Sequence, residues 1–350
     1  MVVLEAKGAN THGLPAGPLS IHDTVVIAGL NASAVAKAGF QPRIPPYIGN
    51  AAPLLGPHEA YVVNGAVYFI DGFGTVWSMG ADGKPVTVAR FPIGVTQQEV
   101  SFAVSPDGCQ FAAAVLTIPP KGPPTSSAPF PTVSGTWKLD TMESASGGNA
   151  SVLHTWTGTT YPGGQGSFHN VTVVGWDSTG PLVVLDAPLG TQASAFIDNP
   201  DFFGGSLAHL DAQGMPSAPI AINTCTPMQV SVRADITCAA PSSDGQSVAI
   251  SVLSSSGGVA VPPLTVPGVP DVAVGPNGMI AVTGQWRNGA GSGTLPANFQ
   301  PEGWIDSTTI FGRIGDPYQG SGDAALARLN GGHATIEDLR FAGDYVGVLG

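Results

Sequence analysis

Acidic and histidine side chains recur at one kind of position, just before the short apolar runs that we expect to be the innermost strands of a repeated unit. The set comprises His58, Glu59, Gln98, Glu99, His169, Asn170, Arg233, Asp235, Asp271, His333, Glu337 and Asp338. If the repeats close into a ring, these side chains converge at one end of it. Oxygen-rich groups suit a hard cation such as Ca2+, which takes about six to eight oxygen ligands. The tentative metal set is Glu59, Glu99, Asp235 and Asp271.

The same residues permit other interpretations. Imidazoles beside carboxylates bind transition metals or act as acid and base near neutral pH, and here His169 is the first suspect beside the four carboxylates. A carboxylate before a strand can also be structural, accepting the backbone hydrogen bonds that fix a loop. The sequence contains no G-x-S-x-G elbow, no H-E-x-x-H and no Walker A motif, so catalytic residues stay unassigned.

A second candidate surface is aromatic. Trp286, Trp304 and Tyr318 fall within a glycine-rich stretch that we expect to be an insertion. Aromatic side chains on such a loop stack on sugars or anchor a protein partner. The alternative is that these rings pack the insertion onto its own blade.

The elements that must position these residues come from an internal repeat. An apolar strand, a tight turn and a second apolar strand appear around Asp107-Gly108, Ser243–Gly245 and Pro276–Gly278, with weaker copies at Asn64-Gly65, Ser178–Gly180 and Gly343-Asp344. Asp-Gly and Asn-Gly between apolar runs favour hairpin turns. A second strand pair follows each copy, as at Val76–Gly83 and Leu207–Gly214. Four antiparallel strands of this kind form one propeller blade.

We therefore predict an all-β fold, a β-propeller of six four-stranded blades within one domain over residues 1–350. Long insertions are expected near 119–134 and 286–322, and seven blades result if an insertion hides one. The chain ends on a first-hairpin copy at 339–349. The N-terminal segment near 24–28 is expected to complete that last blade, closing the ring and removing its open edges.

The turn Ser105-Pro106-Asp107-Gly108 resembles those of the TolB-like six-bladed propellers and their relatives. Members of that family include periplasmic binding proteins, accessory domains of peptidases, and enzymes that process sugars or lactones. The resemblance therefore implies an architecture, and it implies no single function.

Charge and cysteine content narrow the setting. The net charge is −12 with only 12 Lys plus Arg, which disfavours nucleic acid as a partner. No apolar run approaches the roughly 18 residues of a membrane span. Few lysines with abundant Gly, Pro and Ser are typical of an exported protein, here without a signal peptide as written; we expect an extracellular, periplasmic or cell-surface location. Cys225 and Cys238 form a tentative disulfide, leaving Cys109 free and buried.

Three functions follow as hypotheses. The first is an exported, non-enzymatic binding module for a protein, peptide or glycan. The second is a metal-assisted hydrolase or lyase with its site at the mouth of the central channel. The third is a structural surface-layer or filament subunit. The sequence does not predict the oligomeric state.

Overall fold

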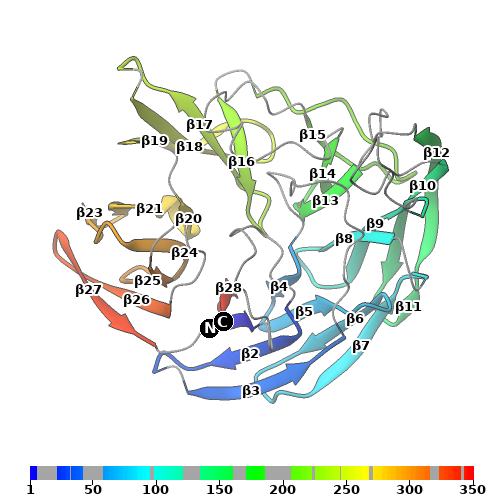
Figure 1. The fold of residues 1–350 in the computed structure, drawn as a ribbon, viewed down its shortest axis with the longest axis horizontal. Helices are drawn as coiled ribbons and strands as arrows, with labels where there is room; N and C mark the ends of the chain where they lie inside the picture. The colour runs from blue at the N-terminus through cyan, green and yellow to red at the C-terminus, as the bar shows by residue number, and fades with distance from the viewer. Residues whose placement is uncertain are drawn as a thin grey trace, which may run out of the picture.

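A computed structural model describes residues 1–5, 22–31, 33–41, 58–94, 98–120, 135–160, 171–185, 206–222, 225–244, 246–267, 271–315, 323–339 and 343–350. Within them, seven small antiparallel sheets stand around a central axis, as Figure 1 shows. The only helix among these residues is a single 3-10 turn, Pro276–Gly278. The chain is thus a seven-bladed β-propeller, and no described helix is long and apolar enough to cross a membrane.

The blades are numbered here in chain order, innermost strand first. Blade 1 contains β4 (Ala60–Val63), β5 (Ala66–Ile70), β6 (Thr75–Met79) and β7 (Pro85–Arg90), and blade 2 contains β8 (Gln98–Val104), β9 (Gln110–Thr117), β10 (Gly135–Ala145) and β12 (Ser151–Thr160). Blade 3 contains β13 (Val171–Trp176), β14 (Pro181–Leu185) and β15 (Ser206–His209), and blade 4 contains β16 (Thr226–Val230), β17 (Ile236–Pro241), β18 (Ser247–Leu253) and β19 (Val259–Pro267). The short β11 (Gly148–Asn149) pairs in parallel with β7.

Three blades complete the ring. Blade 5 contains β20 (Val272–Val274), β21 (Ile280–Val282), β22 (Gln285–Asn288) and β23 (Gly291–Thr294), and blade 6 contains β24 (Phe299–Asp306), β25 (Thr309–Ile314), β26 (Asp323–Asn330) and β27 (His333–Asp338). Blade 7 joins the two ends of the chain: β28 (Asp344–Gly347) pairs with β1 (Val2–Glu5), followed by β2 (Thr24–Ala28) and β3 (Ala34–Gly39). The predicted ring closure by the N-terminal segment is confirmed.

The preferred count of six blades is wrong, and the alternative of seven is correct. The stretch 286–322 is not one insertion, because it holds the two outer strands of blade 5 and the two inner strands of blade 6. The hairpin β24–β25 turns without glycine: Asp306 Oδ1 accepts the backbone N–H of Thr308 at 2.7 Å. This side-chain hydrogen bond stabilises the turn in place of an Asp-Gly pair. Without a glycine, the turn could not be recognised in the sequence.

Two other predicted hairpins are placed differently. The turn at Ser243-Asp244 joins the second and third strands of blade 4, and the first hairpin of that blade turns at Ser231–Asp235. Gly343-Asp344 is no hairpin turn, because Asp344 begins β28, the one strand that the described C-terminal residues contribute to blade 7. In both cases the prediction of a strand boundary at this dipeptide is correct, whereas the prediction of which strands it separates is wrong.

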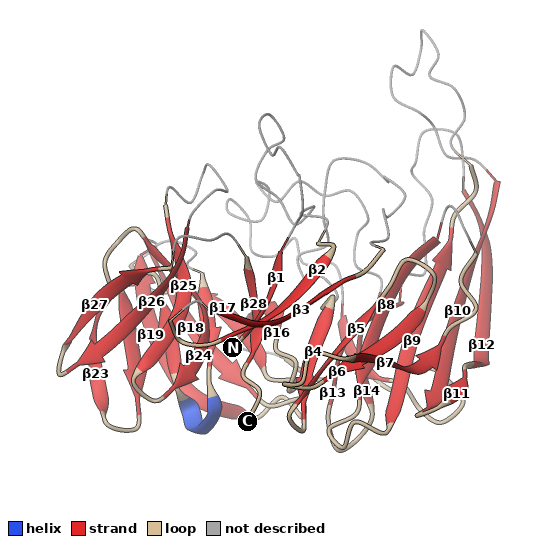
Figure 2. Cartoon of the chain, turned by 90° about the horizontal axis from the view of Figure 1, so that it is seen from below, coloured by secondary structure: helices blue, strands red, loops and turns tan. Residues whose placement is uncertain are grey.

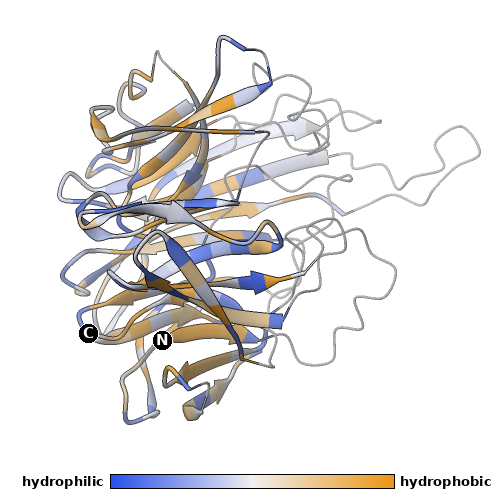
Figure 3. Ribbon diagram, turned by 90° about the vertical axis from the view of Figure 1, so that its left-hand side faces the viewer, coloured by the Kyte–Doolittle hydropathy of each residue, from blue (hydrophilic) through white to orange (hydrophobic). Residues whose placement is uncertain are grey.

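Packing between neighbouring blades makes the core. Tyr61, Phe102, Phe111 and Trp137 are almost fully buried between blades 1, 2 and 3. Figure 3 shows the apolar residues concentrated along the strands. Close contact needs small residues at the inner strands: a Cβ at Gly303 would overlap the ring of Tyr345 in blade 7. The high glycine content thus serves the blade interfaces as well as the turns.

Candidate functional site

All innermost strands run from one end of the ring to the other, and the entry end is defined here as the end where they begin. Glu59 directly precedes β4, Asp271 directly precedes β20, and Asp344 is the first residue of β28. Figure 2 shows the C-terminus and the 3-10 turn at the opposite end. Glu99 is the second residue of β8, so Glu59, Glu99 and Asp271 all lie at the entry end. For these three carboxylates the predicted position at the start of an inner strand is correct.

Five ionisable side chains at the entry end form a continuous chain of contacts, called the closure network here. Glu59 Oε2 lies 2.6 Å from His22 Nδ1, and the second ring nitrogen of His22 contacts Asp344. Asp344 also pairs with Arg313, which in turn pairs with Glu302. The members come from blades 1, 7 and 6, so the network crosses both interfaces of the blade that closes the ring.

His22 is the link between blades 1 and 7 in the closure network. Each of its ring nitrogens faces a carboxylate oxygen, and an ionised carboxylate only accepts hydrogen bonds. A neutral imidazole has a single N–H and satisfies one of these contacts, whereas an imidazolium donates to both. The ring of His22 thus joins two carboxylates of different blades.

Two carboxylates at this end are desolvated, the network member Glu302 and the neighbouring Asp271. Burial raises the pKa of Glu302, and the neighbouring Arg313 partly offsets that rise. Asp271 keeps an exposed side chain, but the blades around it exclude enough water to raise its pKa, again with Arg313 acting in the opposite direction. No hydrogen bond or ion pair to another described residue is made by the Asp271 carboxylate. Asp271 is thus the network's neighbour without being one of its members.

His58 and Glu99 are candidates at the inner strands of blades 1 and 2. His58 Nε2 lies 2.7 Å from the carbonyl oxygen of Val230 in blade 4, a contact that reaches across the ring. Burial lowers the pKa of His58 and raises that of Glu99. Gln98, by contrast, anchors its loop: its side-chain amide donates to Thr117 Oγ1 and accepts from the backbone of Gly94.

Several predicted residues lie elsewhere. Arg233 and Asp235 follow β16 and sit in the first hairpin turn of blade 4, at the end opposite the entry end. His333, Glu337 and Asp338 lie on β27, the outermost strand of blade 6, where Glu337 pairs with Arg328 at 3.2 Å. The error has one cause: strands were assigned to a wrong position within the blade. His169, Asn170 and Tyr318 lie outside the described residues.

The four tentative metal ligands are not brought together, because Asp235 lies at the opposite end from Glu59, Glu99 and Asp271. Within the described part of the chain no group of three or more His, Cys, Asp or Glu is arranged to hold a metal ion. Binding of Ca2+ or another divalent cation stays a prediction, which elemental analysis of protein purified without chelator tests.

Of the two interpretations of Trp286 and Trp304, packing is correct and an exposed stacking surface is not. Both rings are buried, on β22 and β24, with exposed fractions of 4% and 5%. Trp304 Nε1 donates to the carbonyl oxygen of Ala273 at 3.2 Å, which ties blade 6 to blade 5. These tryptophans pack blades and present no stacking surface.

Four residues of the closure network escaped the sequence analysis: His22, Glu302, Arg313 and Asp344. His22 and Asp344 do stand directly before or at the start of a strand, which is the signal used for the others. Glu302 and Arg313 were hidden in the supposed insertion. Their convergence depends on ring closure between segments more than 280 residues apart, as with His22 and Asp344 at a separation of 322.

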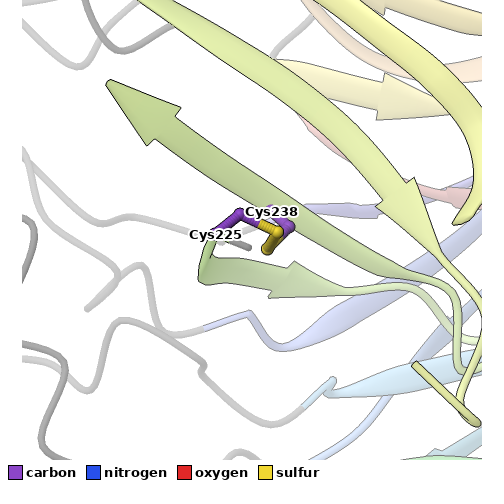
Figure 4. The surroundings of a disulfide bond; sticks show 2 residues. All are labelled: Cys225 and Cys238. Atoms are coloured by element: carbon purple, nitrogen blue, oxygen red, sulfur yellow. A yellow bond between two sulfur atoms is a disulfide. The ribbon is translucent and has the colours of Figure 1, made fainter. Parts of the chain in front are cut away.

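Blade 4 carries a disulfide beside the entry end. Cys225 directly precedes β16 and bonds to Cys238 on β17, with a Cα–Cα distance of 5.6 Å (Figure 4). This is the pairing that the sequence left open. Cys109 is free but exposed, so its expected burial is wrong; it follows Asp107 in a hairpin turn, where a side chain points outward.

Comparison with known proteins finds distant structural likeness. No protein-family model matches the chain, and no curated protein matches it. Similar solved structures include a chain of the mitotic checkpoint complex (13% identity, TM-score 0.40, covering 84% of this chain and 86% of that one). Others are an oligogalacturonate lyase in complex with manganese (10%, 0.38, 90% and 70%) and BamB from Moraxella catarrhalis (11%, 0.34, 89% and 81%). Likeness at this level carries no functional argument.

Proposed function

We propose that the chain is an exported, non-enzymatic binding module that takes a basic peptide, or a basic segment of a partner protein, at the entry end. The observation that carries this proposal is the gathering of four carboxylates, Glu59, Asp271, Glu302 and Asp344, from four consecutive blades. Within the network they contact two basic side chains, His22 and Arg313, of which Arg313 carries a permanent charge. The excess is negative, as is the net charge of −12.

Asp271 is the principal contact in this proposal. Its carboxylate is exposed, partly desolvated and without a hydrogen-bond partner among the described residues. A Lys or Arg side chain of a ligand would give it a charge-assisted hydrogen bond, which is stronger than a neutral one. The surrounding negative field would also raise the rate at which a basic partner arrives.

The proposed location outside the cytoplasm rests on the disulfide. Cys225 and Cys238 are buried or half-buried in blade 4 and joined across one strand pair. Structural disulfides persist in oxidising compartments and are rare in the cytosol. Membership of the TolB-like family remains a proposal carried by the Ser105–Gly108 turn alone, and the seven blades differ from the six of that family.

A charge-matched pair of variants tests the proposal. A ten-residue peptide of alternating Lys and Gly is titrated against the full chain and against Asp271→Asn by isothermal calorimetry. Asp323→Asn is the control, because Asp323 is an exposed acid at the start of β26, two strands farther from the axis. We expect Asp271→Asn to weaken binding about threefold to tenfold, as for loss of one charge-assisted hydrogen bond of about 1 kcal/mol.

Salt supplies the second readout. Binding by exposed charges weakens as the Debye length falls from about 10 Å at 0.1 M to about 3 Å at 1 M ionic strength. We expect the affinity of the peptide to drop with salt and that of Asp323→Asn to follow the wild type. The proposal fails if the peptide does not bind, or if Asp271→Asn and Asp323→Asn lose affinity equally.

A further inference from the structure

The outermost strand of blade 2, β12, has an open edge. It pairs with β10 on one side, and no described residue pairs with it on the other. Figure 1 shows β12 at the periphery of the ring. Its ladder with β10 is regular over the seven residues from His154 to Thr160 and shifts register only beyond them, towards Val152. Unpaired backbone N–H and C=O groups along such an edge are a template for a further strand.

Two other blades cover their outer edges with backbone of this same chain. In blade 1 the short β11 pairs with β7. In blade 3 the segment after β15 folds back along it: Ser217 donates its backbone N–H to the carbonyl oxygen of His209 at 2.8 Å, and Ile220 donates to that of Leu207 at 2.7 Å. These two edges are therefore closed to an incoming strand.

The remaining outermost strands carry features that protect an edge, namely a lysine, prolines, carboxylates or short length. These are Lys37 in β3, Pro262-Pro263 in β19, Glu337 and Asp338 in β27, and the four-residue span of β23. By contrast, β12 contains no Lys, Arg, Asp, Glu or Pro from Ser151 to Thr160. Among the outermost strands that the structure describes, β12 is thus the one with a long and unprotected edge.

The sequence of β12 is complementary to an antiparallel copy of itself. When Thr157 lies opposite Thr157 of a second copy, Thr155 lies opposite Thr159. In the same register Trp156 lies opposite Gly158. Opposed threonines, and an aromatic ring beside an edge glycine, both stabilise antiparallel pairs. The three threonines are exposed, so this pairing moves no side chain out of the core.

Gly158 provides the space for the indole of the second copy. A Cβ at Gly158 would overlap the ring of Trp137 on β10, so the position requires glycine. Trp156 is only half-buried in the single chain, where the ring of His154 lies edge-on to it with the centroids 4.2 Å apart. Covering Gly158 with this indole would bury apolar surface of both rings, which favours association.

We propose that two copies of this chain form a dimer by antiparallel pairing of their β12 strands about a twofold axis at Thr157. The four strands of blade 2 from each copy then make one continuous sheet, with the two β12 strands at its centre. Because each copy uses its open edge in the pair, the assembly closes at two. This inference goes beyond the proposed function, since it concerns the outer edge of blade 2 and does not involve Asp271.

Sedimentation velocity of the full chain across a range of protein concentrations tests the dimer. We expect a species of twice the mass of one chain. Thr157→Glu places two carboxylates opposite each other at the twofold axis, and we expect it to weaken the dimer about tenfold or more. Within one chain the new carboxylate lies opposite Lys138 of β10, which favours the folded blade. Thr265→Glu is the matched control, because Thr265 is an exposed threonine on the outermost strand of blade 4.

Cysteine cross-linking tests the register. In a Cys109→Ser background, Thr157→Cys should form an intermolecular disulfide, because directly opposed Cβ atoms in an antiparallel pair lie about 4.5–5.5 Å apart. Thr155→Cys should cross-link to Thr159→Cys when the two proteins are mixed. Neither should cross-link alone, because its two copies lie about 13 Å apart along the strands. Thr265→Cys in the same background should stay uncross-linked.

Several results would overturn the proposal. One is the mass of a single chain at every concentration. Another is a dimer that Thr157→Glu weakens no more than Thr265→Glu does, because the contact would then lie elsewhere on the molecule. A dimer in which Thr157→Cys forms no disulfide would likewise contradict pairing through β12.

Discussion

At the scale of single residues, the entry end combines satisfied and unsatisfied charges. Glu59, Asp344 and Glu302 each contact a basic side chain, whereas the carboxylates of Glu99 and Asp271 make no hydrogen bond or ion pair to a described residue. An ionised carboxylate that is desolvated without a partner destabilises the folded state. Residues with perturbed pKa values cluster at functional sites. There a bound ligand can offset the free energy that desolvating the carboxylate costs the folded state.

Glu99 gives a prediction with a defined sign. Its folded-state pKa is raised above the unfolded value, so the protonated form favours folding and that contribution is lost as pH rises from about 4.5 through the folded-state pKa. At neutral pH the ionised carboxylate is a cost. We expect Glu99→Gln to be more stable than wild type at pH 7.5, by on the order of 1 kcal/mol, and to lose this advantage at pH 4. Urea unfolding at the two pH values measures it; a variant less stable at pH 7.5 would contradict the assignment.

At the scale of elements, blade 7 depends on both ends of the chain, and the closure network reinforces its two seams. The register Val3↔Tyr345 supplies the backbone pairing, and His22 links Asp344 of this blade to Glu59 of blade 1. Since the contacts cross between segments far apart in sequence, they are formed only when the ring is closed.

His22→Gln tests this role. Glutamine cannot place a ring nitrogen against each of two carboxylates, so the seam between blades 7 and 1 should weaken. Because Glu59 and Asp344 are partly exposed, with side-chain exposures of 47% and 27%, we expect a loss of only about 1 kcal/mol. His333→Gln on the exposed strand β27 is the control. Equal unfolding midpoints in urea for the two variants would show that His22 does not secure the seam.

The disulfide of blade 4 gives a prediction of larger size. Cys225 and Cys238 are separated by 13 residues, and closing a loop of this length constrains the unfolded chain by about 3 kcal/mol. The double variant Cys225→Ser/Cys238→Ser should therefore unfold at clearly lower denaturant, whereas Cys109→Ser should match the wild type. An unchanged midpoint for the double variant would mean that the bond adds no stability.

The elements also show what sequence patterns can predict here. Turns that need positive φ can be recognised in the sequence by their glycine, as at Gly65 and Gly108, and these first hairpins were predicted correctly. The turn after Asp306 uses a side-chain hydrogen bond instead, and it concealed a whole blade. Position within a blade is not encoded locally, because inner and outer strands are both short and apolar; this is why Arg233 and Glu337 were assigned to the wrong strands.

At the scale of the whole molecule, the ring is what creates a site. Glu59, Asp271, Glu302 and Asp344 are spread over 286 positions of the chain, from residue 59 to residue 344, and only closure of seven blades brings them to one end. The tendency of carboxylates to precede inner strands was visible in the sequence, whereas the partners that complete the network, His22 and Arg313, were not. The resulting molecule carries a cluster of carboxylates at its entry end.

Hydrogen exchange of the full chain, with and without the Lys-Gly peptide and read by mass spectrometry, tests the acidic entry end most directly. The account predicts slower exchange on binding in the backbone around 58–63, 271–274, 299–306 and 344–347, and unchanged exchange in the turns 105–109 and 231–235 at the opposite end. Protection of those opposite turns, or no protection anywhere, would contradict a basic-ligand site at the entry end.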